Sequence, residues 1–356
     1  MSDPQRFPVL GAGARPVPAT SRAGSARAGG LVLAGLTLAL AAAGVVVLRS
    51  AVREEPAGTA AQPGGATITT DTALEAAAKA RQAGDFRAAD GILTEAIGHD
   101  ATDERLHLAR AEALLALGDY AGAYRQYQSA IALSGSQGAP ALHFQAGTLA
   151  TKAGLPDRAV EHYAMAMQGD AHNADYPLYL AMVQLKLGRT DEALANLARA
   201  ARLDPDRAEA WGTAAQVYLA RGKDELALQM VRRATALEPA LGRWRLVEAK
   251  ALKRLNEPQE AAALLLGLDE AQRRSPEILG VLGECYGLLG KPGEAALAYA
   301  EAFARAPEPE VRAALAYQAA LWFHRAGQPE EADRFARSAA GLGHEPARQL
   351  LAERGG

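Results

Sequence analysis

Seven histidines and one cysteine are the residues of this chain that could bind a metal ion or act as nucleophiles. A zinc site needs several nitrogen or sulfur ligands that converge on one point. His162 and His172 lie ten residues apart across an expected turn, which is too sparse for such a site. His107 and His143 recur at one position of a repeating pattern, where packing in a core is expected. The sequence therefore predicts no metal site.

Cys285 is the single cysteine, so neither an intramolecular disulfide nor a cluster of thiolate ligands can form. No basic residue close to it in sequence would lower the pKa of its thiol, so we expect a buried and inert side chain. The Gly-Ala-Gly run at Gly11 follows no expected strand, which excludes a dinucleotide-binding turn. No hydrolase motif is present either. We therefore expect no cofactor and no enzymatic activity.

The charge balance argues against a partner that is a nucleic acid. The chain of 356 residues has 38 basic and 41 acidic residues, with a net charge of −3. Binding driven by phosphate neutralisation needs clustered basic charge. Hydrophobic residues make up 49% of the chain but aromatic ones only 5%, and much of the difference is alanine. Such a composition favours helices, because alanine loses no side-chain entropy on entering one.

An uncharged segment runs from Leu31 to Leu48, with Thr37 as its only polar residue. As a helix its 18 residues would rise about 27 Å, close to the thickness of a bilayer core. We predict a transmembrane helix over residues 29–49. A cleaved signal peptide and a buried soluble helix are the alternatives. The long N-terminal head and the length of the apolar core favour an uncleaved anchor.

The flanking charges predict the orientation of this anchor. More arginines precede the segment than follow it: Arg6, Arg15, Arg22 and Arg27 against Arg49 and Arg53. By the positive-inside rule, the N-terminus is cytoplasmic and the rest lies outside, as in a protein of the bacterial inner membrane. Residues 1–28 are rich in Pro and Gly and predict a disordered tail. Residues 50–69 predict a flexible linker.

From residue 70 onward, three columns of residues recur with one common spacing. The first marks expected helix ends, at intervals of 34, 36, 34, 34, 34, 34 and 37 residues: Gly84, Gly118, Gly154, Gly188, Gly222, Asn256, Gly290 and Gly327. Gly and Asn allow the positive φ that ends a helix. An alanine follows each break after five residues, and a further alanine or Leu268 follows after seven more. Each unit therefore predicts a helix, a turn and a second helix with a small-residue face.

This pattern resembles the tetratricopeptide repeat, most clearly in residues 208–241. There Trp211, Ala215, Tyr218, Gly222, Ala227, Ala234 and Pro239 stand at family positions. The resemblance implies an all-α, right-handed α-solenoid of about eight helix–turn–helix repeats within residues 70–344. The repeats are 70–103, 104–137, 140–173, 174–207, 208–241, 242–275, 276–309 and 313–344, and residues 345–356 form a capping helix and tail. Pro258 and Leu268 depart from the pattern, and a three-residue shift follows Pro307.

The resemblance also implies that the first helices of the repeats line a concave groove. By this resemblance, the fifth and ninth residues of each repeat face that groove. In repeat seven, the last repeat to which we assign them, these residues are Gly280 and Glu284. The Lys and Asn that clamp a C-terminal carboxylate in some relatives are missing, so this type of recognition is not expected. Instead, the middle of the predicted groove is apolar, and a basic stretch lies next to it. The predicted groove residues are Leu108, Glu112, Phe144, Thr148, Leu178, Met182, Leu185, Gln216, Arg243, Lys250 and Lys253. The alternative is that the apolar ones pack between repeats and the basic ones are merely solvated.

We therefore predict a membrane-anchored, non-enzymatic scaffold or adaptor. It would bind protein or peptide partners through the groove on the extracytoplasmic side, and no nucleic acid. The alternative is a constitutive, non-catalytic subunit of a membrane secretion, envelope-assembly or translocon-associated complex. The oligomeric state stays open.

Overall fold

The computed structural model describes residues 69–135 and 139–355 of the chain. The predicted tail (1–28), transmembrane helix (29–49) and nearly all of the linker (50–69) lie outside these residues. Within the described ranges, every helix is too short or too polar to cross a bilayer.

The described residues form eighteen α-helices and no strand. The helices are α1 (Thr70–Gln82), α2 (Phe86–His99), α3 (Glu104–Ala116), α4 (Tyr120–Leu133), α5 (Pro140–Lys152), α6 (Pro156–Gly169), α7 (Asp175–Lys186), α8 (Thr190–Leu203), α9 (Ala208–Ala220), α10 (Asp224–Leu237), α11 (Gly242–Arg254), α12 (Pro258–Leu266), α13 (Glu270–Arg273), α14 (Pro276–Leu288), α15 (Pro292–Arg305), α16 (Pro309–Arg325), α17 (Pro329–Gly341) and α18 (Glu345–Gly355).

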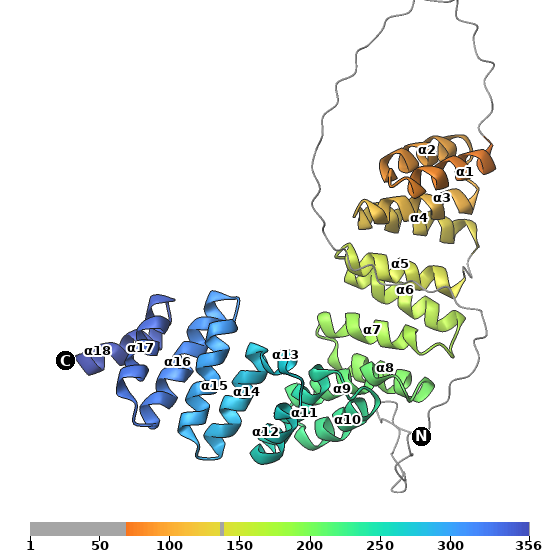
Figure 1. Cartoon of the computed structure of the whole chain (residues 1–356). Coiled ribbons are helices and arrows are strands. Elements are labelled where there is room, and N and C mark those ends of the chain that lie inside the picture. The colour runs from red at the N-terminus through yellow and green to blue at the C-terminus, as the bar shows by residue number, and fades with distance from the viewer. Residues whose placement is uncertain (1–68, 136–138, 356) are drawn as a thin grey trace, which may run out of the picture. The chain divides into compact units, whose positions relative to one another are not determined.

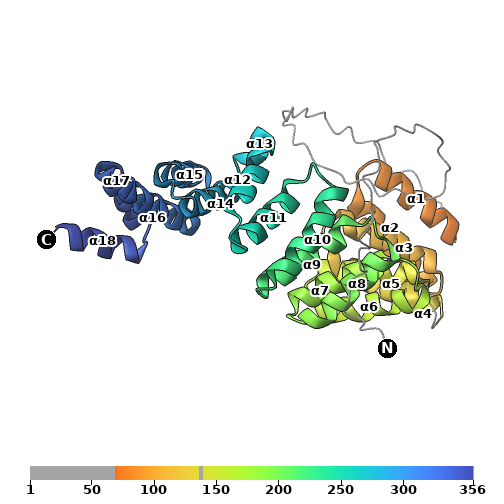
Figure 2. The same ribbon diagram turned by 90° about the horizontal axis from the view of Figure 1, so that it is seen from below.

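Helices that follow one another in sequence pack side by side. Most of the strongest contacts join the two helices of a pair, such as α5 with α6 or α9 with α10, and a second helix also packs on the first helix of the next pair, most closely α15 on α16. Both ribbon views show the pairs following one another in chain order (Figures 1 and 2). The first helix of one pair also touches the first helix of the next, for example α9 with α11 and α11 with α14. This arrangement confirms the predicted all-α solenoid.

The turns between paired helices explain the first repeating column. All seven glycines of the column have φ between 68° and 79°, and Asn256 has φ 64° as the only described non-glycine residue with positive φ. At Gly118 this conformation lets the following amide, that of Asp119, donate to the Leu114 carbonyl at 2.9 Å. The Asp119 carboxylate then accepts from the Gly122 amide at 2.8 Å and caps the next helix. One short segment thus ends one helix and begins another.

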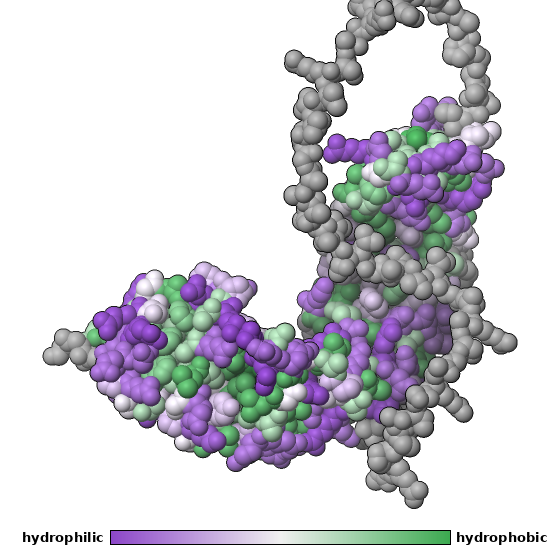
Figure 3. Space-filling model, in the orientation of Figure 1, coloured by the Kyte–Doolittle hydropathy of each residue, from purple (hydrophilic) through white to green (hydrophobic). Residues whose placement is uncertain are grey.

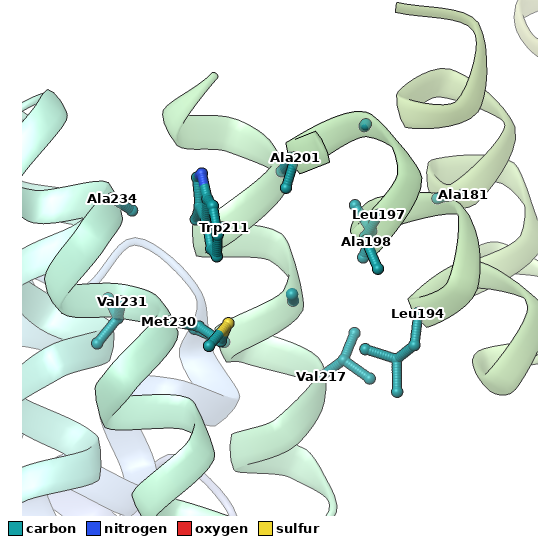
Figure 4. Close-up of a cluster of buried hydrophobic side chains, with 14 of the residues drawn as sticks. Ala181, Leu194, Leu197, Ala198, Ala201, Trp211, Val217, Met230, Val231 and Ala234 are labelled. Carbon is teal, nitrogen blue, oxygen red and sulfur yellow. The ribbon is translucent and has the colours of Figure 1, made fainter. Parts of the chain in front are cut away.

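The alanine columns form the seam between the helices. The alanine that follows each turn glycine or Asn256 by five residues is fully buried in all eight pairs, from Ala89 to Ala332. A small side chain there lets two helix backbones approach closely, and larger neighbours fill the remaining space. In the cluster around α8, α9 and α10, Trp211 lies between Ala201 on one side and Val231 and Ala234 on the other (Figure 4).

The sixth pair departs from the repeat, as its sequence does. α12 ends after nine residues at Leu266, and a single-turn helix, α13, follows before α14. Leu268, which replaces the second alanine, is 5% exposed and belongs to the core cluster of this region. A larger side chain therefore occupies the seam where the second helix has already ended. The repeat pattern does not predict α13.

Candidate protein-binding groove

In α5, the predicted groove residues Phe144 and Thr148 belong to an aromatic cluster. The Phe144 ring lies 5.3 Å from the Tyr176 ring, 5.1 Å from the Tyr179 ring and 5.6 Å from the Tyr163 ring. The Thr148 hydroxyl donates to the Phe144 carbonyl at 3.1 Å and lies 3.2 Å from the Tyr163 hydroxyl. Most of this apolar surface therefore packs between α5, α6 and α7.

The neighbouring predicted residues are unequally accessible. Leu178 is 1% exposed and lies inside a core cluster, and the half-buried Leu185 packs against the same cluster. Leu108 and Met182 are also half-buried, whereas Glu112 is exposed and forms an ion pair with Arg81 of α1. Contact of these residues with a partner stays a prediction.

The basic stretch that the sequence places in α11 is largely neutralised by carboxylates of the same chain. Lys250 forms an ion pair with Glu277, and Lys253 forms one with Glu284, both in α14. Arg243 remains exposed, with a carboxylate oxygen of Glu238 at 3.9 Å. Gln216, Arg243 and Lys250 line one pocket of about 420 Å³ between α9 and α11. Three of the eleven predicted residues thus meet at one site.

A larger groove lies further along the chain, between α14 and α16. It consists of adjoining pockets of about 1000 Å³ and about 540 Å³, which share Gly280, Glu284, Val311 and Leu315. Lys253 is the predicted groove residue that lines the larger pocket, and Lys250 lines the smaller one. We call this surface the α14–α16 groove.

The wall that α16 contributes is one continuous face of that helix. Beyond Glu310 at its first turn, its lining residues are spaced by three, one, three, four and three positions: Val311, Ala314, Leu315, Gln318, Trp322 and Arg325. Such spacing places them on one side of an α-helix. Val311 is 45% exposed, and Leu288 on the opposite wall is 57% exposed. Figure 3 shows hydrophobic surface among hydrophilic residues over α14 to α16.

The sequence alone indicated Gly280, Glu284, Lys250 and Lys253, but it did not indicate Leu288 of α14 or the α16 wall. The three-residue shift after Pro307 obscured the register of the last pair, so its fifth and ninth positions could not be assigned. A signal was nevertheless present: Val311, Leu315 and Trp322 fall on one helical face, separate from the buried alanines of α16. Reading that second apolar face would have indicated the groove.

His107, His143, His162 and Cys285 contact neighbouring residues of the same chain. Burial raises the pKa of the Cys285 thiol to about 11, which agrees with the expected inert side chain. His107 makes hydrogen bonds to the Gln126 side chain at 2.8 Å and to the Ala101 carbonyl at 3.1 Å. His143 and His162 contact each other through their Nδ1 atoms at 3.1 Å. The described residues contain no group of three or more His, Cys, Asp or Glu side chains that could hold a metal.

Comparison with known proteins supports the repeat assignment. Residues 150–216 and 184–251 match the family model of the tetratricopeptide repeat. No curated protein sequence matches the chain significantly. Many solved structures do resemble it.

Three of these structures indicate the extent of the fold. A tetratricopeptide repeat protein from Parabacteroides merdae has a TM-score of 0.53 at 19% identity, over 70% of this chain and 97% of that one. The pilF protein of Pseudomonas aeruginosa has a TM-score of 0.51 at 16% identity, over 60% and 97%. The C-terminal part of a repeat protein from Cytophaga hutchinsonii has a TM-score of 0.50 at 13% identity, over 78% and 98%. These likenesses show the fold.

Proposed function

We propose that this chain, a tetratricopeptide repeat protein by its repeats and its fold, is a non-enzymatic scaffold that binds a protein or peptide segment in the α14–α16 groove. The exposed apolar wall of that groove carries the proposal. Val311 and Leu288 are 45% and 57% exposed beside a pocket of about 1000 Å³, and apolar surface concentrated in a cleft is typical of a binding site. The tetratricopeptide fold suggests protein partners.

The proposal includes the membrane anchor over residues 29–49, with the repeats on the extracytoplasmic side of a bacterial inner membrane. Its support is the uncharged stretch from Leu31 to Leu48 and the excess of arginines before it. An anchor would confine the groove near the membrane and raise the effective concentration of partners there. A reporter that is active only outside the cytoplasm, fused after Gly356, should be active. Activity of a cytoplasm-only reporter in its place would refute the orientation.

Proximity labelling from the full-length chain tests the binding role. We expect the double variant Leu288→Glu and Val311→Glu to lose the labelled partners, because two carboxylates would be desolvated in the contact. Leu297→Glu is the matched control: Leu297 is 63% exposed on α15 and lies outside the groove. Identical labelling by the double variant and the unaltered chain would contradict the proposal.

The same apolar wall also suits the alternative function, a constitutive subunit of a membrane complex. A permanent interface of this kind is more apolar than a transient one and withstands salt. Co-purification of one partner at high salt, lost in the double variant, would favour the constitutive subunit. Partners that exchange within minutes would favour the adaptor.

A further inference from the structure

We propose that the occupant of the α14–α16 groove is an amphipathic helix of about 14 residues that lies antiparallel to α16. Its acidic N-terminal end would lie at Arg325 and its basic C-terminal end at Glu308 and Glu310. This inference rests on the proposed binding function and specifies the class of partner. It follows from the shape of the groove, from one glycine in its wall and from the charges at its two ends.

The shape of the groove favours a helix over an extended peptide. The lining face of α16 runs from Val311 to Arg325, which corresponds to about 21 Å along a helix axis. Both walls are α-helices, whose central backbone groups are already hydrogen-bonded, so an extended peptide would find few backbone partners on them. A helix satisfies its own backbone groups and presents only side chains. Helices with anchors at positions i, i+3, i+4 and i+7 bind in apolar grooves of this type.

Gly280 gives the occupant room to approach closely. α14 also contains Gly283, where a Cβ would lie 2.7 Å from the Tyr299 ring, and Gly287, where it would overlap the Trp322 ring. Packing within the chain therefore requires these two glycines. A Cβ on Gly280 would meet only the Leu315 side chain, at 3.9 Å, although Gly280 lines both pockets. A glycine inside a helix is unfavourable, and close approach of a partner accounts for this one.

The free charges that line the groove at the two ends of α16 have opposite signs. At its N-terminal end, the exposed Glu308 and Glu310 side chains have no cationic partner among the described residues. At its C-terminal end, the Arg325 guanidinium lies over the Trp322 ring, 4.5 Å from its centroid, and has no carboxylate partner in the described part of the chain. Between these ends, Glu277 and Glu284 are already paired with lysines.

These charges determine the direction of the occupant. Acidic side chains are favourable near the N-terminus of a helix and basic ones near its C-terminus. An ordinary amphipathic helix therefore matches Arg325 with its first turn and Glu308 and Glu310 with its last turn. That orientation is antiparallel to α16.

The direct test uses two fluorescent peptides and the full-length chain. Each peptide has about 14 residues and leucines on one helical face. The first peptide has glutamates in its first turn and lysines in its last turn. The second has the same composition, but its leucines are moved so that they no longer share one helical face. Anisotropy should show binding of the first peptide and at least tenfold weaker binding of the second. Equal binding of the two peptides, or binding of neither, would overturn the inference.

Variants of Gly280 separate this contact from an effect on folding. We expect Gly280→Ala to raise Tm, because alanine favours the helix, and yet to weaken binding of the first peptide. Gly280→Leu should weaken it at least tenfold. Gly91 of α2 also has open space around a Cβ, so Gly91→Ala and Gly91→Leu are matched controls that should leave binding unchanged. Unchanged binding in both Gly280 variants would refute the close approach.

Charge reversal tests the direction. Arg325→Glu should weaken the first peptide and strengthen a third that has lysines in its first turn and glutamates in its last turn. If Arg325→Glu affects both peptides equally, the antiparallel orientation is wrong. If no peptide binds but the double variant of Leu288 and Val311 still loses its labelled partners, the occupant is not such a helix, and the proposed binding function stands. Failure of both experiments would refute the binding function itself.

Discussion

His162 uses both ring nitrogens in the seam between α4, α5 and α6. Its Nδ1 contacts His143 Nδ1 at 3.1 Å, and its Nε2 lies 3.1 Å from the Tyr124 hydroxyl. Burial, with a smaller contribution from the neighbouring His143, lowers its pKa from 6.5 to about 4. The folded protein therefore favours the neutral ring. Two charged rings would both present a proton to the other at the shared contact.

Stability should consequently fall on acidification. A group with a depressed pKa in the folded state contributes stability that is present above pH 6.5 and is lost as the pH falls toward 4. Because the ring is partly exposed, we expect a loss of about 1 kcal/mol between about pH 7 and about pH 5. Urea unfolding at the two pH values measures it. His162→Gln should reduce this loss, whereas His172→Gln, at an exposed site, should not. An equal pH dependence in both variants would contradict the assignment.

Gly212 illustrates a glycine that packing within the chain requires. A Cβ at this position in α9 would overlap the ring of Trp244, which is 2% exposed in α11. We expect Gly212→Ala to lower the free energy of unfolding by about 1–2 kcal/mol, because overpacking outweighs the better helix propensity of alanine. Denaturant unfolding provides the measurement, and Gly91→Ala should instead be neutral or stabilising. If Gly212→Ala is stabilising instead, the Trp244 ring moves aside without a measurable loss of stability, and the expected overpacking is absent.

At the scale of elements, α4 depends on a cap that most later second helices lack. The Asp119 carboxylate accepts a hydrogen bond from the Gly122 amide at 2.8 Å, whereas Arg189 and Lys223, which stand at the N-cap positions of α8 and α10, make no side-chain capping bond. Asp119→Ala should lower stability by about 1 kcal/mol, and Asp119→Ser should retain most of it. Lys223→Ala is the control and should have little effect. If Lys223→Ala is equally destabilising, the capping bond is not the cause.

The elements also show how far the sequence predicts this molecule. The glycine and alanine columns are local signals, because positive φ and a small residue at a helix seam are needed at each turn. They predicted the turns and the buried alanines. Other features depend on residues remote in sequence. Lys253 is paired with Glu284, 31 positions away, so the loss of free basic charge in α11 could not be read from α11 itself.

The candidate site was only partly predictable for the same reason. Gly280 and Glu284 of its α14 wall could be placed because the seventh repeat keeps the common spacing. Its α16 wall could not, because α16 follows an irregular connection and is 17 residues long. Phe144 and Leu178 have groove-like positions in the repeat, but the aromatic cluster and the core around them decide their exposure. The exposure of these two side chains depends on the size of the side chains in neighbouring helices, which their position in the repeat does not reveal.

On the scale of the whole molecule, each helix pair packs mainly on its neighbours, so stability should be local. The last pair is completed by α18: Ala347 is fully buried in the cluster of α16 and α17, and Leu350 and Leu351 pack against it. Removing residues 345–356 would expose that cluster. It would leave the contacts of the first pairs unchanged.

We expect this deletion to lower amide-exchange protection in α16 and α17 by about 2–3 kcal/mol, as the loss of a few buried apolar side chains implies. Protection in α1 to α8 should not change, and binding in the α14–α16 groove should weaken because its α16 wall opens more often. Hydrogen exchange with mass spectrometry resolves these regions. A control chain that ends at Ala352 keeps Ala347, Leu350 and Leu351 and should behave like the full chain. A uniform loss of protection along all helices would mean that the array unfolds as one unit, and that the groove is coupled to every repeat.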